Sequence, residues 1–227
     1  MGYENIQKNK SHHHDWLIKK IDDRITKLMT GDIEPSIPLP PIKSLEISHI
    51  VSPPKKTQEI LEKSSIIANV ECICRKNSNN PCNAPLDVCL IIDPQIAKDA
   101  IQEEKGKRIT VSKAMDILKK TTETGLVHML LHFRGGTYHA ICSCCSCCCH
   151  DLVALLKYNH TNLIEKSEYI AKHDTDLCLN CKSCIKYCNF KALVKKDDDI
   201  ILNQDRCYGC GVCVVHCPNG ALNLVKR

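Results

Sequence analysis

Six cysteines are packed into eight consecutive positions in the middle of the chain, within the stretch ICSCCSCCCH. Adjacent thiols that stay free would oxidise in any aerobic setting. We therefore expect this run to bind metal ions or a cluster of metal and inorganic sulfide. Its members are Cys142, Cys144, Cys145, Cys147, Cys148 and Cys149.

The last part of the chain carries a second cysteine pattern, an internal repeat with a period of 29 residues. The runs CLNCKSCIKYCNFKAL and CYGCGVCVVHCPNGAL begin at Cys178 and Cys207, and both read C-x-x-C-x-x-C-x-x-x-C followed by Ala-Leu. Three thiolates on one tight loop reach three corners of a cube, so the fourth corner must come from elsewhere. In the bacterial two-cluster spacing, the fourth cysteine of each run ligates the other cluster.

Residues 174–227 therefore resemble the two-[4Fe–4S] ferredoxin family and are expected to form its β-α-β repeat module. The resemblance implies two [4Fe–4S] clusters. One would be held by Cys178, Cys181, Cys184 and Cys217, and the other by Cys207, Cys210, Cys213 and Cys188. Zinc in paired C-x-x-C sites is the alternative, and two complete repeats argue against it.

Small departures from the family pattern concern turns rather than ligands. Pro218 matches the family's proline after the fourth cysteine, whereas Asn189 replaces it in the first run. Gly209 and Gly211 suit backbone N–H groups packed against sulfides in the second loop. Asn180 and Ser183 are expected in the matching places of the first loop.

The other cysteines form two groups, of which the first has the spacing C-x-C-x7-C-x6-C: Cys72, Cys74, Cys82 and Cys89. Four thiolates within eighteen residues can close one tetrahedral or cubane site. Arg75 could donate to a sulfur or offset cluster charge, and a surface arginine is the alternative.

The chain beyond about residue 55 also resembles a family of iron–sulfur proteins from anaerobic bacteria and archaea. The resemblance rests on CICR…C…P…CL, on a helix ending in GLVH, on a strand leading into ICSCCSCCC, and on the two-cluster module, in that order. It implies iron–sulfur cofactors but names no reaction.

The partition of these ten upper cysteines stays open. Neighbours in an extended segment point to opposite sides, so Cys144 and Cys145, or Cys148 and Cys149, could ligate different clusters. Ten thiolates allow two cubanes with two thiols spare, or one cubane with a larger or non-cubane cluster. A zinc site at the first group is a third alternative. We favour two further iron–sulfur centres.

Four histidines lie on or beside the predicted hairpin: His128, His132, His139 and His150. Imidazole can replace thiolate on iron and raise its potential. With enough cysteines present, a packed or surface histidine is the better interpretation for each.

Composition supports a metalloprotein. The chain of 227 residues has 18 cysteines but only 4% aromatic residues, so metal clusters are expected to organise much of its interior. The polar N-terminus shows no secretory signal and no run is long enough to span a bilayer, which predicts a cytoplasmic, anaerobic protein. The formal charge of +5 counts every cysteine as neutral, and two clusters of about −2 each would bring it to about +1. Nucleic acid is therefore not expected as a partner.

Periodicity and breakers outline the elements that carry these cysteines. We expect a helix over 15–29, a proline-rich connector over 35–54, a helix after the N-cap Ser52, and a buried strand over 66–74. A helix over 112–124 should precede a β-hairpin over 126–141, and residues 151–170 should return to helix. The predicted fold class is α+β, divided into 1–51 (helix and connector), 52–172 (cysteine-rich domain with the hairpin) and 173–227 (ferredoxin domain).

The leading functional interpretation is electron transfer, which relays low-potential electrons between redox partner proteins, including those of a larger oxidoreductase complex. The chain shows no catalytic triad, phosphate loop or dinucleotide fingerprint, so a carrier or a subunit is favoured over a stand-alone enzyme. One alternative is reductive catalysis at an unusual cluster held by the run from Cys142 to Cys149. The other is a redox-sensing regulator.

Overall fold

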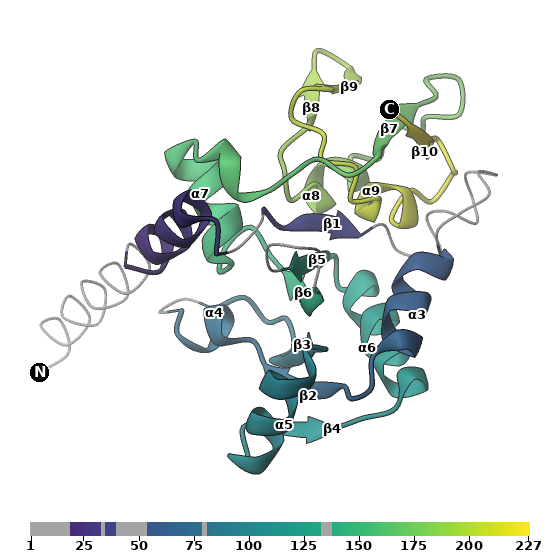
Figure 1. Ribbon diagram of the computed structural model, residues 1–227. Coiled ribbons are helices and arrows are strands. Elements are labelled where there is room, and N and C mark those ends of the chain that lie inside the picture. Colours follow the sequence, from purple (N-terminus) through teal and green to yellow (C-terminus); the bar gives the residue numbers. More distant parts are fainter. Residues whose placement is uncertain (1–18, 33–34, 40–53, 79–80, 133–137) are drawn as a thin grey trace, which may run out of the picture.

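The computed structural model describes residues 19–32, 35–39, 54–78, 81–132 and 138–227 (Figure 1). These residues form a mixture of helices and antiparallel sheets. Ser52 and the first part of the predicted 15–29 helix lie outside them, and so do much of the connector and the turn of the hairpin. In the described part of the chain, no helix is long and apolar enough to cross a membrane.

The upper part of the molecule is built on a sheet that has six strands among the described residues, in the order β1-β5-β6-β3-β2-β4. The predicted hairpin is its centre, since β5 and β6 pair antiparallel. All its pairings are antiparallel. The strands are β1 (Ile37–Leu39), β2 (Ala68–Glu71), β3 (Asp87–Ile91), β4 (Gly106–Arg108), β5 (Val127–His132) and β6 (Tyr138–Cys144).

Helices cover this sheet. Helices α3 (Pro54–Lys63) and α6 (Val111–Glu123) contact each other, and their apolar faces share a core with Leu90 and Ile141 of the central strands. Helix α5 (Pro94–Gln102) was not predicted, although Asp93 caps it by accepting from the backbone N–H groups of the first turn. Short α4 is Ile73–Lys76, and α7 is His150–Tyr158.

The predicted helix over 151–170 was wrong in its second half. Helix α7 ends at Tyr158, and its C-cap residue Asn159 adopts the left-handed conformation typical of a helix C-terminus. A 3-10 turn at Thr161–Leu163 follows, and strand β7 then begins at Tyr169.

The C-terminal unit repeats a β-α-β motif twice. The first copy is β7 (Tyr169–His173), α8 (Ser183–Tyr187) and β8 (Leu193–Lys196); the second is β9 (Asp199–Leu202), α9 (Val212–Val215) and β10 (Leu222–Lys226). Strand β10 pairs with β7 and β9 with β8, both antiparallel. Strand β7, which opens the first copy, spans the predicted boundary at residues 172 and 173.

One hydrophobic core joins the two units. It contains Val127 and Met129 of β5, Leu152 of α7, and Phe190 and Tyr208 of the C-terminal unit. A helix over 19–30 lies beside α7 and adds Ile21 to this core (Figure 1). Its apolar face, with Ile25 and Leu28, agrees with the predicted periodicity.

Candidate metal centres

The structure gathers the eight C-terminal cysteines into two quartets around separate cavities. We call the group Cys178, Cys181, Cys184 and Cys217 the outer quartet, and the group Cys188, Cys207, Cys210 and Cys213 the inner quartet. These are the two sets that the ferredoxin resemblance implies, each with one cysteine from the opposite run.

The loops that carry them are shaped for close packing around sulfur. Gly209 has φ +70° and Gly211 has φ +72°, and the equivalent residues one repeat earlier, Asn180 and Lys182, have φ of 51° and 61°. The prediction that Ser183 matches Gly211 was wrong by one position, because Lys182 carries the left-handed conformation.

Backbone N–H groups already point at several of these sulfurs. Ala192 donates to Cys188 Sγ and Ala221 donates to Cys217 Sγ, each at 3.2 Å, in equivalent places of the two repeats. Ala171 donates to Cys207 Sγ at 3.5 Å. Such donors stabilise charged sulfur and tune the potential of a bound cluster. The quartets therefore fit iron–sulfur clusters.

Burial keeps several of these thiols protonated. It raises the pKa of Cys184 to about 11 and that of Cys210 to about 12. It also raises the pKa of Cys213 well above its ordinary value. Because a metal ligand must be the thiolate, metal binding here has to displace protons.

The ten upper cysteines divide differently from their order in the sequence. Cys82 leaves the first group and joins three members of the run. We call this set the four-thiol set: Cys82, Cys145, Cys147 and Cys148, whose sulfurs all lie within 4.8 Å of one another. The remaining cysteines, which we call the six-thiol set, are Cys72, Cys74, Cys89, Cys142, Cys144 and Cys149, and all line one large pocket.

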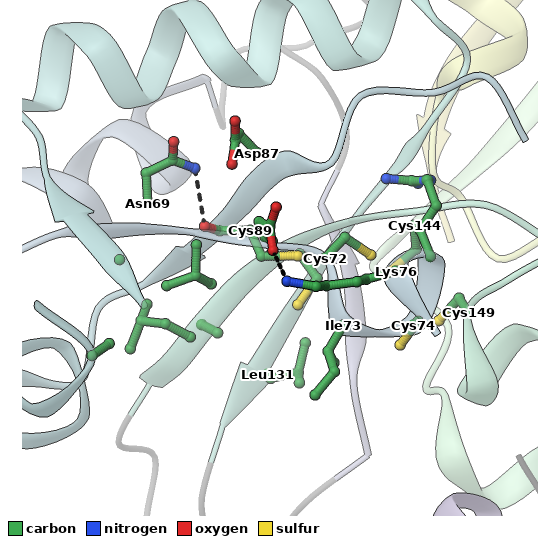
Figure 2. Close-up of a pocket in the computed structure, with 18 of the residues that line it drawn as sticks. Asn69, Cys72, Ile73, Cys74, Lys76, Asp87, Cys89, Leu131, Cys144 and Cys149 are labelled. Carbon is green, nitrogen blue, oxygen red and sulfur yellow. Dashed lines mark hydrogen bonds and ion pairs between the residues drawn. The ribbon is translucent and has the colours of Figure 1, made fainter. Parts of the chain in front are cut away.

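Local structure explains the six-thiol set. Leu90 of β3 pairs with Ile141 of β6, so Cys89 and Cys142 are neighbours across the strands. Helix α4 carries Cys74, and Cys149 is the N-cap residue of α7. Figure 2 shows members of the set facing a common space from these elements.

The six thiols form a closed ring of interactions. Each interacts with two others, in the circular order Cys72, Cys74, Cys149, Cys144, Cys142, Cys89. These neighbours lower the pKa of Cys72 to about 3 and hold the pKa of Cys142 and Cys149 well below the ordinary value. The same interactions raise the pKa of the alternate thiols Cys74, Cys89 and Cys144. The six sulfurs therefore lie close enough together to be candidate ligands of one centre.

The pocket inside and beside this ring has a volume of about 1010 Å³. That is the upper end of the range of about 300–1,000 Å³ for small-molecule sites. Its lining includes lysines and glutamates as well as cysteines, among them Lys76, Lys105, Lys107, Glu71 and Glu104. The space can hold a polynuclear centre, and charged side chains line its wall.

Arg75 lies between the two upper sets. It is 1% exposed, and its guanidinium donates to Pro85 O at 2.6 Å, to Ser143 O at 3.3 Å and to Cys145 Sγ at 3.5 Å. Burial alone would lower its pKa, but Cys145 and Cys72 raise it above the ordinary value. Its buried Nε has no acceptor among the described residues. The surface alternative for Arg75 was wrong.

The histidines have different surroundings. His128 is packed in the interior, where its Nε2 lies 3.1 Å from Thr121 Oγ1. His150 places Nδ1 3.1 Å from Cys74 Sγ and Nε2 3.3 Å from Asp151. His139 lines the large pocket, and the side chain of His132 lies outside the described residues.

Asn189 joins the two units, a role that its place in the sequence did not suggest. It follows Cys188 of the inner quartet. Its side chain donates to Gly125 O at 2.8 Å and accepts from the backbone N–H of Ser146 at 3.1 Å. The absence of the family's proline at this position was the available signal.

Comparisons with known proteins agree with the C-terminal geometry. Residues 177–222 match the family described as 4Fe-4S dicluster domain. An uncharacterised ferredoxin of Methanocaldococcus jannaschii is 34% identical over 82 residues, which cover 35% of this chain and 49% of that protein. The pyruvate synthase subunit PorD of Methanothermobacter marburgensis is 35% identical over 54 residues, covering 24% and 63%.

A longer similarity reaches the upper unit. The probable oxidoreductase YjgC of Bacillus subtilis is 23% identical over 189 residues, which are 72% of this chain and 19% of that protein. The chain thus spans about half or less of the first relatives that it matches.

Proposed function

We propose that this chain, whose residues 177–222 match the 4Fe-4S dicluster domain family, is a multi-cluster iron–sulfur electron-transfer protein. The outer and inner quartets would each hold a [4Fe–4S] cluster, and the six-thiol set would hold a further iron–sulfur centre. Such centres accept and release single electrons when bound. Residues 52–172 and 173–227 would then be the two redox units, with 1–51 as the N-terminal segment.

One observation carries the proposal: cysteines of both units belong to a single hydrophobic core. Cys144 and Cys149 of the six-thiol set are buried in the same cluster of side chains as Cys210 of the inner quartet. Phe190 and Tyr208, stacked with centroids 4.5 Å apart, fill the space between these elements. A dry, rigid contact of this kind keeps two redox centres close and at a fixed separation.

The outer quartet offers the contact for a redox partner. Cys181 is exposed, and the neighbouring Leu177 and Leu179 are 46% and 66% exposed. Exposed apolar side chains beside a metal site suit a transient protein contact. We infer that electrons enter or leave here and that the six-thiol set is the far end of the route. Similarity to a pyruvate synthase subunit favours a partner within an oxidoreductase complex.

The test is a potentiometric titration followed by electron paramagnetic resonance, on protein purified without oxygen. We expect at least eight irons per chain from the two cubanes, at about four irons each, and more from the upper centre. Photoreduced flavin should reduce the C-terminal clusters and a further centre whose signal is changed in Cys149→Ser. The control Cys181→Ser should alter the outer cluster alone. An upper centre that stays oxidised while both C-terminal clusters are reduced would contradict the relay.

The large pocket supports a second candidate, reductive catalysis at the six-thiol set. A cubane has four irons and needs four terminal ligands, so six thiolates exceed one all-cysteine cubane. The adjoining space can admit a small molecule. Cyanide or carbon monoxide should then shift the signal that Cys149→Ser changes. If neither shifts any signal, the electron carrier remains and the catalytic candidate is abandoned.

A further inference from the structure

We propose that the four-thiol set, Cys82, Cys145, Cys147 and Cys148, binds a single zinc ion rather than an iron–sulfur cluster. Its four cysteines are distinct from those of the proposed electron route, although Cys145 and Cys148 also line the large pocket of the six-thiol set. No comparison assigns it, and the sequence did not bring these four residues together.

Sulfur spacing is the first argument. Cys82 Sγ lies 3.6 Å from Cys145 Sγ, and Cys147 Sγ lies 3.6 Å from Cys148 Sγ. Four thiolates at about 2.3 Å from one zinc ion lie about 3.8 Å from one another, which is the edge of a regular tetrahedron. The sulfurs therefore already have nearly the spacing that one tetrahedral ion requires.

The C-terminal quartets provide an internal comparison. Within the described part of the chain, the four-thiol set is the one group of three or more potential ligands whose atoms all lie within 4.8 Å. The outer and inner quartets, which the ferredoxin resemblance assigns to cubanes, do not meet this limit, and neither does the six-thiol set. A cubane places four irons between its ligands and so needs more widely spaced sulfurs. The four-thiol set has no such space.

The surroundings suit a closed structural site. Cys145 and Cys148 are buried, Cys82 is half-buried and Cys147 is exposed. Four thiolates around Zn²⁺ carry a net charge of −2, and the Arg75 guanidinium, 3.5 Å from Cys145 Sγ, offsets part of it. Soft thiolate ligands in a tetrahedron are the preferred environment of structural zinc.

The proposed zinc ion would have a structural role. Zinc would fasten the segment carrying Cys82 to the loop Cys145–Cys148. Ser146 of that loop donates to Asn189, beside the inner quartet. The zinc ion would thus hold the loop Cys145–Cys148 in place. Cys144 and Cys149 of the six-thiol set flank that loop directly. It would act by position, without carrying electrons itself.

The direct test is zinc K-edge X-ray absorption on the full chain, purified without oxygen from medium containing both iron and zinc. We expect about one zinc per chain, bound by four sulfurs at about 2.3 Å and by no nitrogen. Iron in place of zinc at this site, mononuclear or clustered, would overturn the proposal.

Two cysteine variants test whether the zinc ion is bound by the four-thiol set. Cys147→Ser alters the exposed ligand and should reduce bound zinc several-fold with little loss of iron. Cys181→Ser, an exposed cysteine of the outer quartet, should reduce iron and leave zinc at one per chain. If Cys147→Ser fails to fold, cobalt replacement in the unmodified chain decides: tetrahedral tetrathiolate absorption supports the site, and octahedral bands contradict it. A failed electron relay would change neither zinc result.

Discussion

At the scale of single residues, Arg75 illustrates how one buried cation can serve two thiol sets. It donates to Cys145 of the four-thiol set and lies close enough to Cys72 of the six-thiol set for their charges to interact. A buried charge is costly unless it is paired and hydrogen-bonded. Here two backbone carbonyls and the sulfurs stabilise it, so the guanidinium is fixed between the sites.

We expect Arg75→Leu to lower the free energy of unfolding by about 2–3 kcal/mol, because Pro85 O and Ser143 O lose their donor. For a chain of this size that corresponds to a fall in Tm of about 4–12 °C. Circular dichroism of the anaerobic protein measures it. Lys76→Leu, at an exposed neighbouring position, should change stability by no more than about 1 kcal/mol. Equal Tm values for the two variants would show that Arg75 is not structurally important.

His128 predicts a pH dependence of stability. Complete burial lowers its pKa from 6.5 to about 4, so the unfolded chain binds the proton more tightly than the folded one. The stabilisation is present above pH 6.5 and is lost as pH falls towards 4. Between pH 8 and pH 5.5 the loss should be about 1.4 kcal/mol. His128→Gln should lack this component, which thermal melts across that range can detect. A pH profile that is the same in both proteins would contradict it.

How far the sequence predicts each metal site depends on whether its candidate ligands lie close together along the chain. The C-terminal cysteines form a short periodic motif, and its resemblance to the two-cluster ferredoxins implied how Cys178 and Cys207 are grouped with their partners. The upper sets depend on strand register instead. Cys89 meets Cys142 because β3 pairs with β6, whereas Cys82, only seven residues earlier, precedes the strand and turns to Cys145. The spacing of the cysteines along the chain does not predict which of them meet.

At the scale of elements, the loop before α9 packs directly against β7. Gly209 has φ +70°, and a Cβ there would lie 2.0 Å from Tyr169 O and 2.3 Å from Ser167 Oγ. The backbone at Tyr169 cannot make room for this Cβ unless strand β7 moves. The glycine is thus required by both its conformation and its contact.

We expect Gly209→Ala to lower the free energy of unfolding by at least about 3 kcal/mol and to impair loading of the inner quartet. Gly220→Ala is a matched control: its φ is +65°, but a Cβ there meets nothing within 4 Å. It should cost about 1–2 kcal/mol, from the left-handed backbone alone. Iron content and Tm compare the two. Similar losses would mean that the contact with β7 is unimportant.

The helices and strands differed in how well the local sequence pattern predicted them. The helix α6 and the hairpin β5–β6 were predicted because their apolar periodicity runs without interruption. The second half of the 151–170 helix failed because Asn159 ends α7, and the stretch that follows joins the C-terminal sheet. There, pairing of β7 with β10 outweighs local helix propensity.

At the scale of the whole molecule, the two units are held together by more than the shared core. His216 of the C-terminal unit stacks on Tyr187 with ring centroids 3.6 Å apart, and its Nε2 lies 3.0 Å from Thr122 O at the end of α6. A Cβ on Gly125 would lie 2.5 Å from the Tyr187 ring, so the units are in close contact there. Together with Asn189, these contacts would set the separation of the proposed redox centres.

Asn189 therefore provides the sharpest test of coupling between the units. Asn189→Ala removes the bonds to Gly125 O and to the Ser146 N–H, and should cost about 1–3 kcal/mol of stability. The ligands are untouched, so the midpoint potentials of the C-terminal clusters should stay unchanged. Transfer to the six-thiol centre, followed by rapid mixing and freeze-quench spectroscopy, should slow because the separation is no longer fixed.

The matched control is Asn219→Ala, which removes a side chain that donates to Leu177 O within the C-terminal unit. It should leave the transfer rate between units as in the unmodified chain, since Asn219 does not touch the upper unit through that bond. If Asn189→Ala loses stability while transfer to the six-thiol centre keeps its rate, Asn189 only holds the fold together. A slower rate at unchanged potentials would instead show that the contact between the units controls the distance over which electrons move.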